Sequence, residues 1–342
     1  MRGFSSFRKG VAEYFLYPFC SGHEAVILFF ILSGFVLSIP AIALRAQTYP
    51  VFVIRRLFRI YMPYLAALIL AILGDMVFHG HVTHSVWFNE AWSDQVKWRL
   101  VWQHLTFIGQ YDTKPFDPPI WSLVFEMRIS LVFPLLCAIA LKLRPGWLLI
   151  TAVFISGLSL VVIQLCHLQH FDTSFILTAH YAAFFMVGIY LARQKDVISR
   201  IVTHLSRRKR VAFAALSVLF YLYGSWVSMN IAHRFTGHDL WYQTEWITVL
   251  GAGGLIVCSL NSESWRRVLL WPPIHALGKM SYSVYLLNFI IMLLFVHLLY
   301  GRIPLLSIFS LCLVFVIAAS WVFYCLVEMP LMNIGRRLTG YM

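Results

Sequence analysis

The feature that most constrains this chain is a series of apolar segments, each about 20 residues long, that recurs from one end to the other. A segment of that length crosses the hydrocarbon core of a bilayer as a helix. Only 12% of the 342 residues are charged, whereas soluble domains carry about 25%. So few charges do not cover a water-soluble surface, and the sequence therefore predicts an integral membrane protein.

We identify about nine spans by this criterion. They are 24–44, 60–79, 121–142, 147–166, 175–192, 211–228, 243–260, 280–299 and 304–327. Helix is required because lipid offers backbone amides no hydrogen-bond partner. The expected fold is an all-α, polytopic transmembrane bundle that forms a single domain over residues 1–342.

The distribution of positive charge predicts the orientation of these spans. If 24–44 runs inward, 17 of the 27 Lys and Arg residues fall on the inner side and 8 on the outer side. Cytoplasmic loops are enriched in Lys and Arg, so the C-terminus is expected in the cytoplasm. The same rule accounts for the net charge of +13 without nucleic acid. Membrane lipid is the expected surrounding.

Other polar features are weaker. The six cysteines show no metal-ligand spacing, so no metal site is expected. The segment 80–120 is the long outer connection, rich in Trp and His. It suits a lid or an acceptor platform, and interfacial packing explains it about as well.

Glu126 and Arg128 are charged residues inside the span 121–142. Such residues cost at least about 2.5 kcal/mol at the centre of a transmembrane helix and usually serve a function. They are two residues apart and do not face each other. Each therefore needs a partner on another helix or in a wet cavity, and the alternatives are a structural ion pair or snorkelling of Arg128.

Arg55, Arg56 and Arg59 lie at the inner mouth of the second span, in the sequence RRLFRIYMPY. Guanidinium groups bind phosphate through two parallel hydrogen bonds. The cluster would suit a phosphorylated cytosolic donor such as coenzyme A. From the charges alone, topology and contact with lipid headgroups are the simpler explanation.

Hydroxyl, acidic and histidine side chains elsewhere are further candidates. Tyr282 and Tyr285 recur at helical spacing, and small or hydroxyl residues such as Ser33 commonly line helix–helix contacts in membranes. Glu328 stands at the inner end of the last span. His23 and its neighbour Glu24 form a candidate acid/base pair at the outer mouth of the first span.

Five ordered segments of the sequence resemble acyltransferase family 3, the polytopic bacterial O-acyltransferases that modify surface polysaccharides. The segments are FFILSGFVLS, RRLFRIYMPY, PPIWSLVFEMRISLVFP, LGKMSYSVYLLNFI and VEMPLMNIGRRL. They extend from about residue 21 to residue 338, and their order and spacing are more specific than any one of them.

The resemblance implies that an acyl group, typically acetyl, moves from cytosolic acyl-CoA to a hydroxyl of a saccharide, lipid-linked or other cell-envelope acceptor. It implies a bacterial inner-membrane location. In this interpretation Arg55, Arg56 and Arg59 bind the donor. Glu126 and Arg128 shape the catalytic site, and Ser33, Tyr282, Tyr285 and Glu328 support it.

Two departures from the family pattern bear on activity. Family members begin with a further helix that carries an arginine and, about eleven residues later, a histidine thought to be essential. The sequence 8–23 has an Arg and a His at the wrong spacing. We therefore expect that the family domain has ten spans and that this chain lacks the first of them. Asn288 replaces a frequent histidine. Without the family histidine, His23 is the alternative base.

Two other function classes remain open at this stage. A transporter or flippase of a polar or lipid-linked solute would also carry Glu and Arg inside the membrane, but it would not depend on acyl-CoA. An inactive, truncated relative is the other alternative.

Overall fold

The computed structural model describes residues 22–45, 47–80, 83, 88–92, 96–166, 173–236 and 241–340. Within these ranges the chain is helical and contains no strand, which confirms the all-α prediction. Nine helical segments in the described part are long and apolar enough to cross a membrane. The predicted number of spans is therefore confirmed.

The first half of the chain contains these helices in order: α2 Gly22–Ile42, α3 Tyr49–Arg56, η1 Leu57–Tyr61, α4 Met62–Phe78, η2 Phe88–Glu90, α5 Trp98–Thr106, η3 Pro118–Ile120, α6 Trp121–Lys142 and α7 Pro145–Leu165. Here α3, η1 and α4 form one continuous span from Tyr49 to Phe78. This span begins well before the predicted residue 60, because the arginines interrupt the hydrophobic pattern but not the helix.

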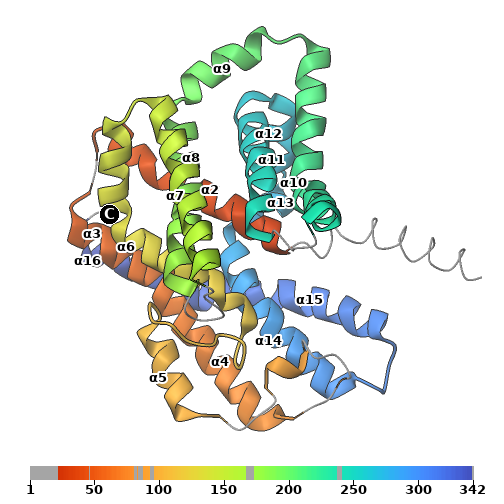
Figure 1. Ribbon diagram of the computed structural model, residues 1–342. Coiled ribbons are helices and arrows are strands. Elements are labelled where there is room, and N and C mark those ends of the chain that lie inside the picture. Colours follow the sequence, from red (N-terminus) through yellow and green to blue (C-terminus); the bar gives the residue numbers. More distant parts are fainter. Residues whose placement is uncertain are drawn as a thin grey trace, which may run out of the picture. The chain divides into compact units, whose positions relative to one another are not determined.

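The second half contains α8 Ser174–Arg193, α9 Lys195–His204, α10 Arg207–Thr236, α11 Trp241–Asn261, α12 Glu263–Leu269, α13 Pro272–Lys279, α14 Ser281–Leu299, α15 Leu305–Phe323, η5 Tyr324–Glu328 and α16 Met329–Leu338. The spans at α10 and α15 are longer than predicted, since each continues as a helix into a basic, polar end (Figure 1).

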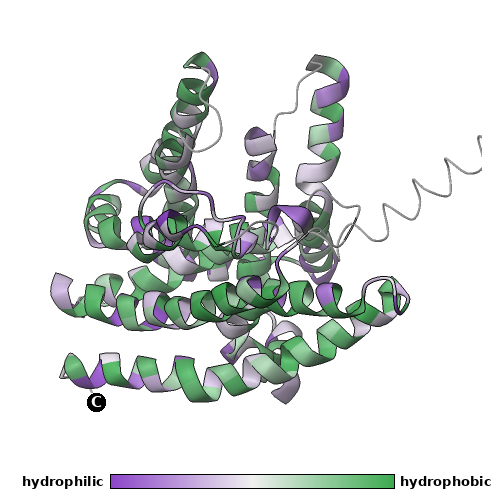
Figure 2. Ribbon diagram, turned by 90° about the horizontal axis from the view of Figure 1, so that it is seen from below, coloured by the Kyte–Doolittle hydropathy of each residue, from purple (hydrophilic) through white to green (hydrophobic). Residues whose placement is uncertain are grey.

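The long helices carry apolar side chains on their exposed faces as well as inside. Phe154, Leu306 and Leu326 are among the large hydrophobic residues that are more than half exposed. Figure 2 shows this composition as long stretches of hydrophobic residues along the ribbons. Helices that are apolar on all sides are typical of membrane spans.

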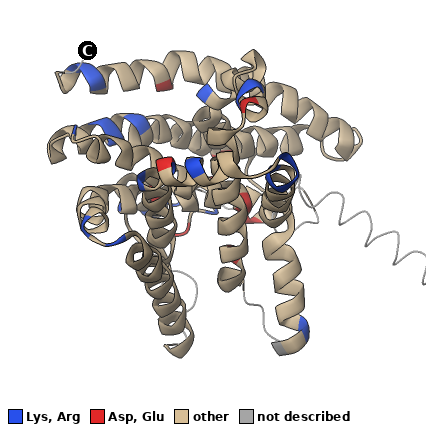
Figure 3. Ribbon diagram, turned by 90° about the horizontal axis from the view of Figure 1, so that it is seen from above, with Lys and Arg blue, Asp and Glu red and all other residues tan. Residues whose placement is uncertain are grey.

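Charged residues are sparse along the same helices (Figure 3). A visible exception is the basic turn at the C-terminal end of α16, which contains Arg336 and Arg337. Cations at this position complement the partial negative charge of a helix C-terminus.

The contacts divide the chain into two compact units. The first unit comprises the described residues of Met1–Ala46 and Phe133–Val268. The second unit comprises the described residues of Gln47–Val132 and Leu269–Met342. The expectation of a single domain over the whole chain stays a prediction.

In the first unit, α2 packs against α8 at very short range. A Cβ atom at Gly34 would lie 2.1 Å from the backbone oxygen of Phe185, and one at Gly188 would lie 2.1 Å from that of Ile31. Each helix therefore needs glycine where it meets the other. Small residues commonly allow such close helix–helix contacts in membranes. Ser33, a predicted supporting residue, is buried in α2 beside this contact.

The second unit has a core of aromatic and aliphatic residues from α4, α6, α14 and the loop 107–120. Tyr64, Trp92, Phe107 and Phe289 are each at most 1% exposed in this core. The indole nitrogen of Trp92 donates a hydrogen bond to the carbonyl of Phe116. The core thus fixes the loop that precedes α6 and its charged residues.

Candidate functional site

A buried ion pair joins the second and third spans within the second unit. Nη1 of Arg56, at the end of α3, lies 3.4 Å from Oε1 of Glu126 on α6, and the two side chains are 9% and 3% exposed. Glu126 therefore has the partner on another helix that its position in a span requires. Burying two charges inside a span costs desolvation free energy. Such a pair therefore usually fixes a structure or serves a reaction.

The arginine cluster continues into a π-helical turn, η1, that includes Arg59. Arg59 is exposed and close enough to Glu126 and Glu328 to interact with both electrostatically. Turns of this type widen the helix and are frequent at functional sites. A Cβ atom at Gly335 would lie 2.7 Å from Cβ of Phe58, so α16 packs directly on this turn.

Arg55 has a different environment from its neighbours. Its Nε donates a hydrogen bond of 3.1 Å to Oγ1 of Thr339, just beyond α16. The three predicted donor-binding arginines thus diverge: Arg55 ties the C-terminal helix to α3, Arg56 pairs with Glu126, and Arg59 faces outward. An exposed guanidinium beside a buried ion pair could bind an anionic ligand.

Arg128 contacts the loop before α6. Its Nε donates to the carbonyl of Ile108 over 2.9 Å, and its Nη2 donates to the carbonyl of Gly109 over 2.5 Å. The guanidinium also lies 5.8 Å from the ring centre of Phe125. These contacts give Arg128 a clear part in anchoring the loop 107–120.

Both predicted tyrosines on α14 hydrogen-bond to backbone carbonyls. The hydroxyl of Tyr282 donates to the carbonyl of Ile60, in the π-helical turn, over 2.7 Å. The hydroxyl of Tyr285 contacts the carbonyl of Pro119 and lies 2.9 Å from Oγ of Ser122. The pair therefore links α14 to both ends of the polar region around Glu126.

Glu328 ends a second π-helical turn, η5, and is 2% exposed. Oγ of Ser283 donates a hydrogen bond of 2.5 Å to its Oε2. Glu328 therefore belongs to the interior of the second unit and not to an exposed interface. Asn288 donates to the carbonyls of Val284 and Tyr285 on its own helix, which makes it a local contact.

Asp117 was not among the predicted site residues, although an acid directly before the Pro-Pro start of a span is a usable signal. Asp117 is 1% exposed, and neither carboxylate oxygen has a hydrogen-bond partner among the described residues. Burial raises its pKa well above the ordinary value of an aspartate. A buried acid without a partner costs folding free energy and calls for a functional explanation.

His104 lies in the same region, on α5. Its Nδ1 is 2.8 Å from the carbonyl of Leu100, and its ring packs against those of Tyr111 and Phe116. Burial lowers its pKa to about 4. The side chain is therefore neutral at physiological pH, and this histidine of the predicted acceptor segment is part of a core.

The first unit holds a second polar cluster, centred on Glu245 of α11. Its Oε1 lies 2.6 Å from Nε2 of His23 on α2, and its Oε2 lies 2.9 Å from Nε2 of His180 on α8. Nδ1 of His180 is 2.8 Å from Oγ of Ser156 on α7. The sequence-predicted His23 thus belongs to this polar cluster, where Glu245 is a hydrogen-bond partner.

Glu245 and His180 were not among the predicted site residues. The usable signal was the same one that identified Glu126, an ionisable side chain inside an apolar span. Glu245 stands near the end of its span, where an ionisable side chain costs less than at the centre of a span. Its two partners lie 222 and 65 residues away in the sequence, so no local pattern reveals them.

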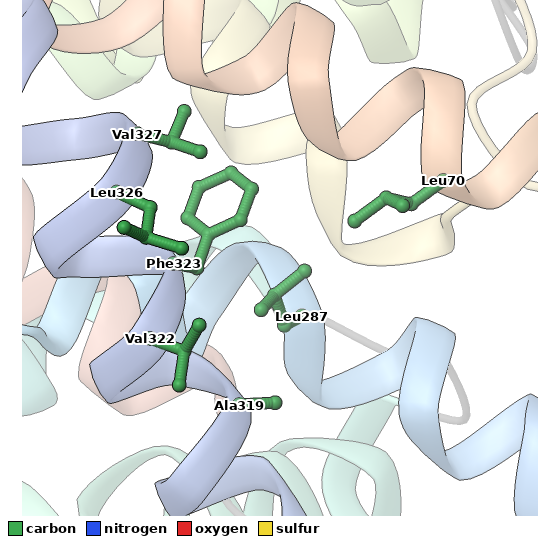
Figure 4. A pocket seen from close by; sticks show the side chains of 7 residues that line it. All are labelled: Leu70, Leu287, Ala319, Val322, Phe323, Leu326 and Val327. Atoms are coloured by element: carbon green, nitrogen blue, oxygen red, sulfur yellow. The ribbon is translucent and has the colours of Figure 1, made fainter.

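A groove of about 370 Å³ lies in the second unit and is lined only by apolar residues (Figure 4): Leu70, Leu287, Ala319, Val322, Phe323, Leu326 and Val327. This lining suits hydrocarbon and offers no hydrogen bond to a phosphate or a sugar. The groove is therefore not the place where a polar donor or acceptor would bind.

Some predicted features lie outside the described residues. These are the arginine of the sequence 8–23, Arg8, and the part of the segment 80–120 that includes His81 and His84. In the part of the chain that is described, no group of three or more His, Cys, Asp or Glu side chains is arranged to hold a metal ion.

Comparison with known proteins gives a consistent result. A family model described as an acyltransferase domain matches residues 2–325. The curated relatives include the O-acetyltransferase OatA of Staphylococcus aureus strains NCTC 8325, COL and MRSA252. Each is 23% identical over 260 residues, which is 72% of this chain and 41% of the relative. The chain thus spans about two fifths of the length of these relatives, and no solved structure matches it significantly.

Proposed function

This chain belongs to acyltransferase family 3, and from that premise we propose that it transfers an acetyl group from cytosolic acetyl-CoA to a hydroxyl of a cell-envelope saccharide. The family match supports an acyltransferase activity in a multi-pass membrane protein. The acetyl group and the envelope acceptor are suggested by the relatives, which are named O-acetyltransferases.

The observation that carries the proposal is the buried Arg56–Glu126 pair with the exposed Arg59 beside it. Coenzyme A carries phosphate groups that need cationic partners. Arg59 makes no hydrogen bond or ion pair to other described residues and is available to a phosphate. Glu126 keeps the two guanidinium groups, Arg56 and Arg59, close together despite their mutual repulsion.

The reaction requires a nucleophilic hydroxyl and stabilisation of a tetrahedral oxyanion. The acceptor oxygen forms a bond to the acyl carbon, the carbon–sulfur bond to coenzyme A breaks, and the hydroxyl proton ends on the thiolate. Arg56 is proposed to stabilise the developing negative charge. Tyr282, Tyr285 and Glu328 hold the helices around the ion pair in place through the contacts described above.

The proposed orientation follows from the charge distribution. It places the arginine cluster and the C-terminus on the cytoplasmic side of a bacterial inner membrane, as the excess of Lys and Arg in inner loops favours. Acetyl-CoA is made in the cytoplasm, so a donor site at this face would be supplied directly. A saccharide or lipid-linked acceptor would then be modified within or across the bilayer.

The experiment is a comparison of cells that lack the gene with cells that carry it. Base-labile acetate in purified envelope saccharide should be present only with the active gene, and Glu126→Gln should abolish it. Glu263→Gln is the matched control, because the side chain of Glu263 is 60% exposed and its ion pairs among the described residues are with two arginines of its own helix, α12. Equal ester content with and without the gene would refute the proposal and favour a transporter.

A further inference from the structure

The side chain of Asp117, in the loop before α6, is a buried acid of the second unit to which the proposed function gives no task. It is 1% exposed, and neither carboxyl oxygen has a hydrogen-bond partner among the described residues. Its backbone, by contrast, is held firmly. The amide donates to the carbonyl of Thr113 over 3.3 Å, and the carbonyl accepts from the amide of Ile120 over 3.1 Å. The carboxyl therefore lacks a partner in a loop that is otherwise well ordered by hydrogen bonds.

Two tyrosines of the second span hold the segment that leads to Asp117. The hydroxyl of Tyr61, at the end of the π-helical turn η1, donates to the carbonyl of Leu105 over 2.6 Å. The hydroxyl of Tyr64 donates to the carbonyl of His104 over 3.2 Å. The end of α5 is thus fixed beside the turn that contains Arg59.

Two tyrosines of α14 hold the other end of the loop in the same way. Tyr282 donates to the carbonyl of Ile60, which follows Arg59 directly, and Tyr285 contacts the carbonyl of Pro119. These tyrosines are three residues apart, a rise of about 4.5 Å along a helix. The loop before α6 therefore returns into the second unit to the level of the arginine turn.

The charged groups at this level surround the same two tyrosines. Tyr285 is close enough to Asp117 and Glu126 to interact with both electrostatically. Tyr282 interacts in the same way with Glu126 and Arg59. Asp117 and Arg59 therefore border one polar region within a single unit. A donor whose phosphates bind Arg59 would place its long, flexible arm and its thioester in this region.

We propose that the carboxyl of Asp117 contacts the acceptor hydroxyl and carries its proton to the sulfur of coenzyme A. This inference rests on the proposed function and assigns the proton transfer to a residue of the donor's own unit. Burial favours the neutral form of a carboxyl group. A neutral carboxyl has one oxygen that accepts a proton and one that donates a proton, and both oxygens of Asp117 are without a hydrogen-bond partner among the described residues.

The proton transfer balances without a further reactant. As the acceptor oxygen bonds to the acyl carbon, its proton moves to the carbonyl oxygen of Asp117. As the carbon–sulfur bond breaks, the proton on the other carboxyl oxygen moves to the sulfur of coenzyme A. The carboxyl is neutral before and after the reaction, and Arg56 stabilises the oxyanion between the two steps, as in the proposed function.

Contact between the substrate and this carboxyl requires a shift of the segment that covers it. Pro118 and Pro119, which follow Asp117 directly, are partly exposed. At the start of the loop, Phe107 has a φ of +58°, which is unfavourable for a residue other than glycine. Such strain is concentrated at active sites and switch regions. Catalytic contacts often form only when the substrate is bound.

The test measures acetyl transfer by the purified protein in liposomes, with acetyl-CoA and an envelope oligosaccharide as substrates. Asp117→Asn keeps the shape of the side chain but cannot pass a proton, and it should lower kcat by about 10²–10⁴-fold while acetyl-CoA affinity stays unchanged. Asp112→Asn is the matched control in the same loop. Oδ1 of Asp112 accepts a hydrogen bond from the amide of Lys114, which asparagine can also accept, so this variant should behave like the wild type.

Thermal unfolding of the same proteins separates a catalytic role from a structural one. Asp117→Leu removes a buried polar group without a hydrogen-bond partner and should unfold at a temperature no lower than that of the wild type, although it is inactive. Lower unfolding temperatures for both Asp117 variants would show a structural role and refute the inference.

Activity supplies the other decisive outcomes. An active wild type whose Asp117→Asn variant stays within about threefold of its kcat would refute the inference and leave the proposed function standing, because an essential proton carrier is worth far more than that. A wild type that transfers no acetyl group would refute the proposed function and this inference together.

Discussion

Replacing the members of the Arg56–Glu126 pair singly and together separates their structural role from their chemical one. At 3.4 Å, the attraction of two unit charges is about 5 kcal/mol at an effective dielectric constant of about 20. Removing one partner leaves the other charge buried. Arg56→Met or Glu126→Leu alone should therefore lower the free energy of unfolding by about 3–5 kcal/mol.

The double variant should behave differently in the two assays. With both charges gone, two apolar side chains of similar volume fill the space, and stability should return to within about 1 kcal/mol of the wild type. Acetyl transfer should stay lost, because the cation proposed to stabilise the transition state is missing. Stability is measured by denaturant titration in mixed micelles, and activity is measured in liposomes from the same preparations.

Two results would refute this reasoning. If each single variant lost less than about 1 kcal/mol, the pair would not be buried as the structure has it. If the double variant regained both stability and activity, the pair would be purely structural, and the reaction would have to be assigned to other residues.

Three further predictions follow from other parts of the chain. Arg59→Ala should weaken acetyl-CoA binding and make the binding less dependent on salt. Arg59→Lys should restore the affinity only partly, because the planar guanidinium is lost. The control Arg200→Ala, at an exposed arginine of α9, should leave acetyl-CoA binding unchanged. Gly188→Ala should destabilise the protein by about 1–3 kcal/mol or more in thermal or denaturant unfolding, since its Cβ would collide with backbone 2.1 Å away; wild-type stability would contradict the short α2–α8 distance. Burial lowers the pKa of His104 to about 4, whereas an unfolded histidine has a pKa of about 6.5. As the pH falls, the unfolded chain therefore binds a proton at His104 before the folded chain does. The free energy of unfolding should thus fall by about 2 kcal/mol between neutral pH and about pH 5. A His104→Gln variant should lack this pH dependence, and equal slopes for the two proteins would contradict it.

Much of the fold could be predicted because lipid leaves an apolar chain few alternatives. Each apolar run had to become a helix, since hydrocarbon satisfies no backbone hydrogen bond. The π-helical turns at Leu57–Tyr61 and Tyr324–Glu328 could not be predicted in this way. They depend on packing against other helices, such as that of Phe58 on Gly335. They do not change the hydrophobic pattern of the sequence.

Some members of the two polar clusters could be singled out from the sequence, but their pairings could not. Glu126 stood out because an acid inside a span is costly, but its partner Arg56 lies 70 residues away. The same rule applied to the end of span 243–260 would have found Glu245. His23 was expected to pair with its sequence neighbour, Glu24, whereas the helix packing brings it to Glu245.

The central claim is that this protein moves an acetyl group from acetyl-CoA to a saccharide hydroxyl. The direct measurement uses purified protein in liposomes, acetyl-CoA labelled in the acetyl carbon, and an oligosaccharide from the cell envelope. The account predicts a labelled, base-labile ester on the saccharide and one free thiol released per ester formed, both lost in Glu126→Gln. Thiol release without a labelled saccharide ester, or equal labelling by Glu126→Gln, would contradict it.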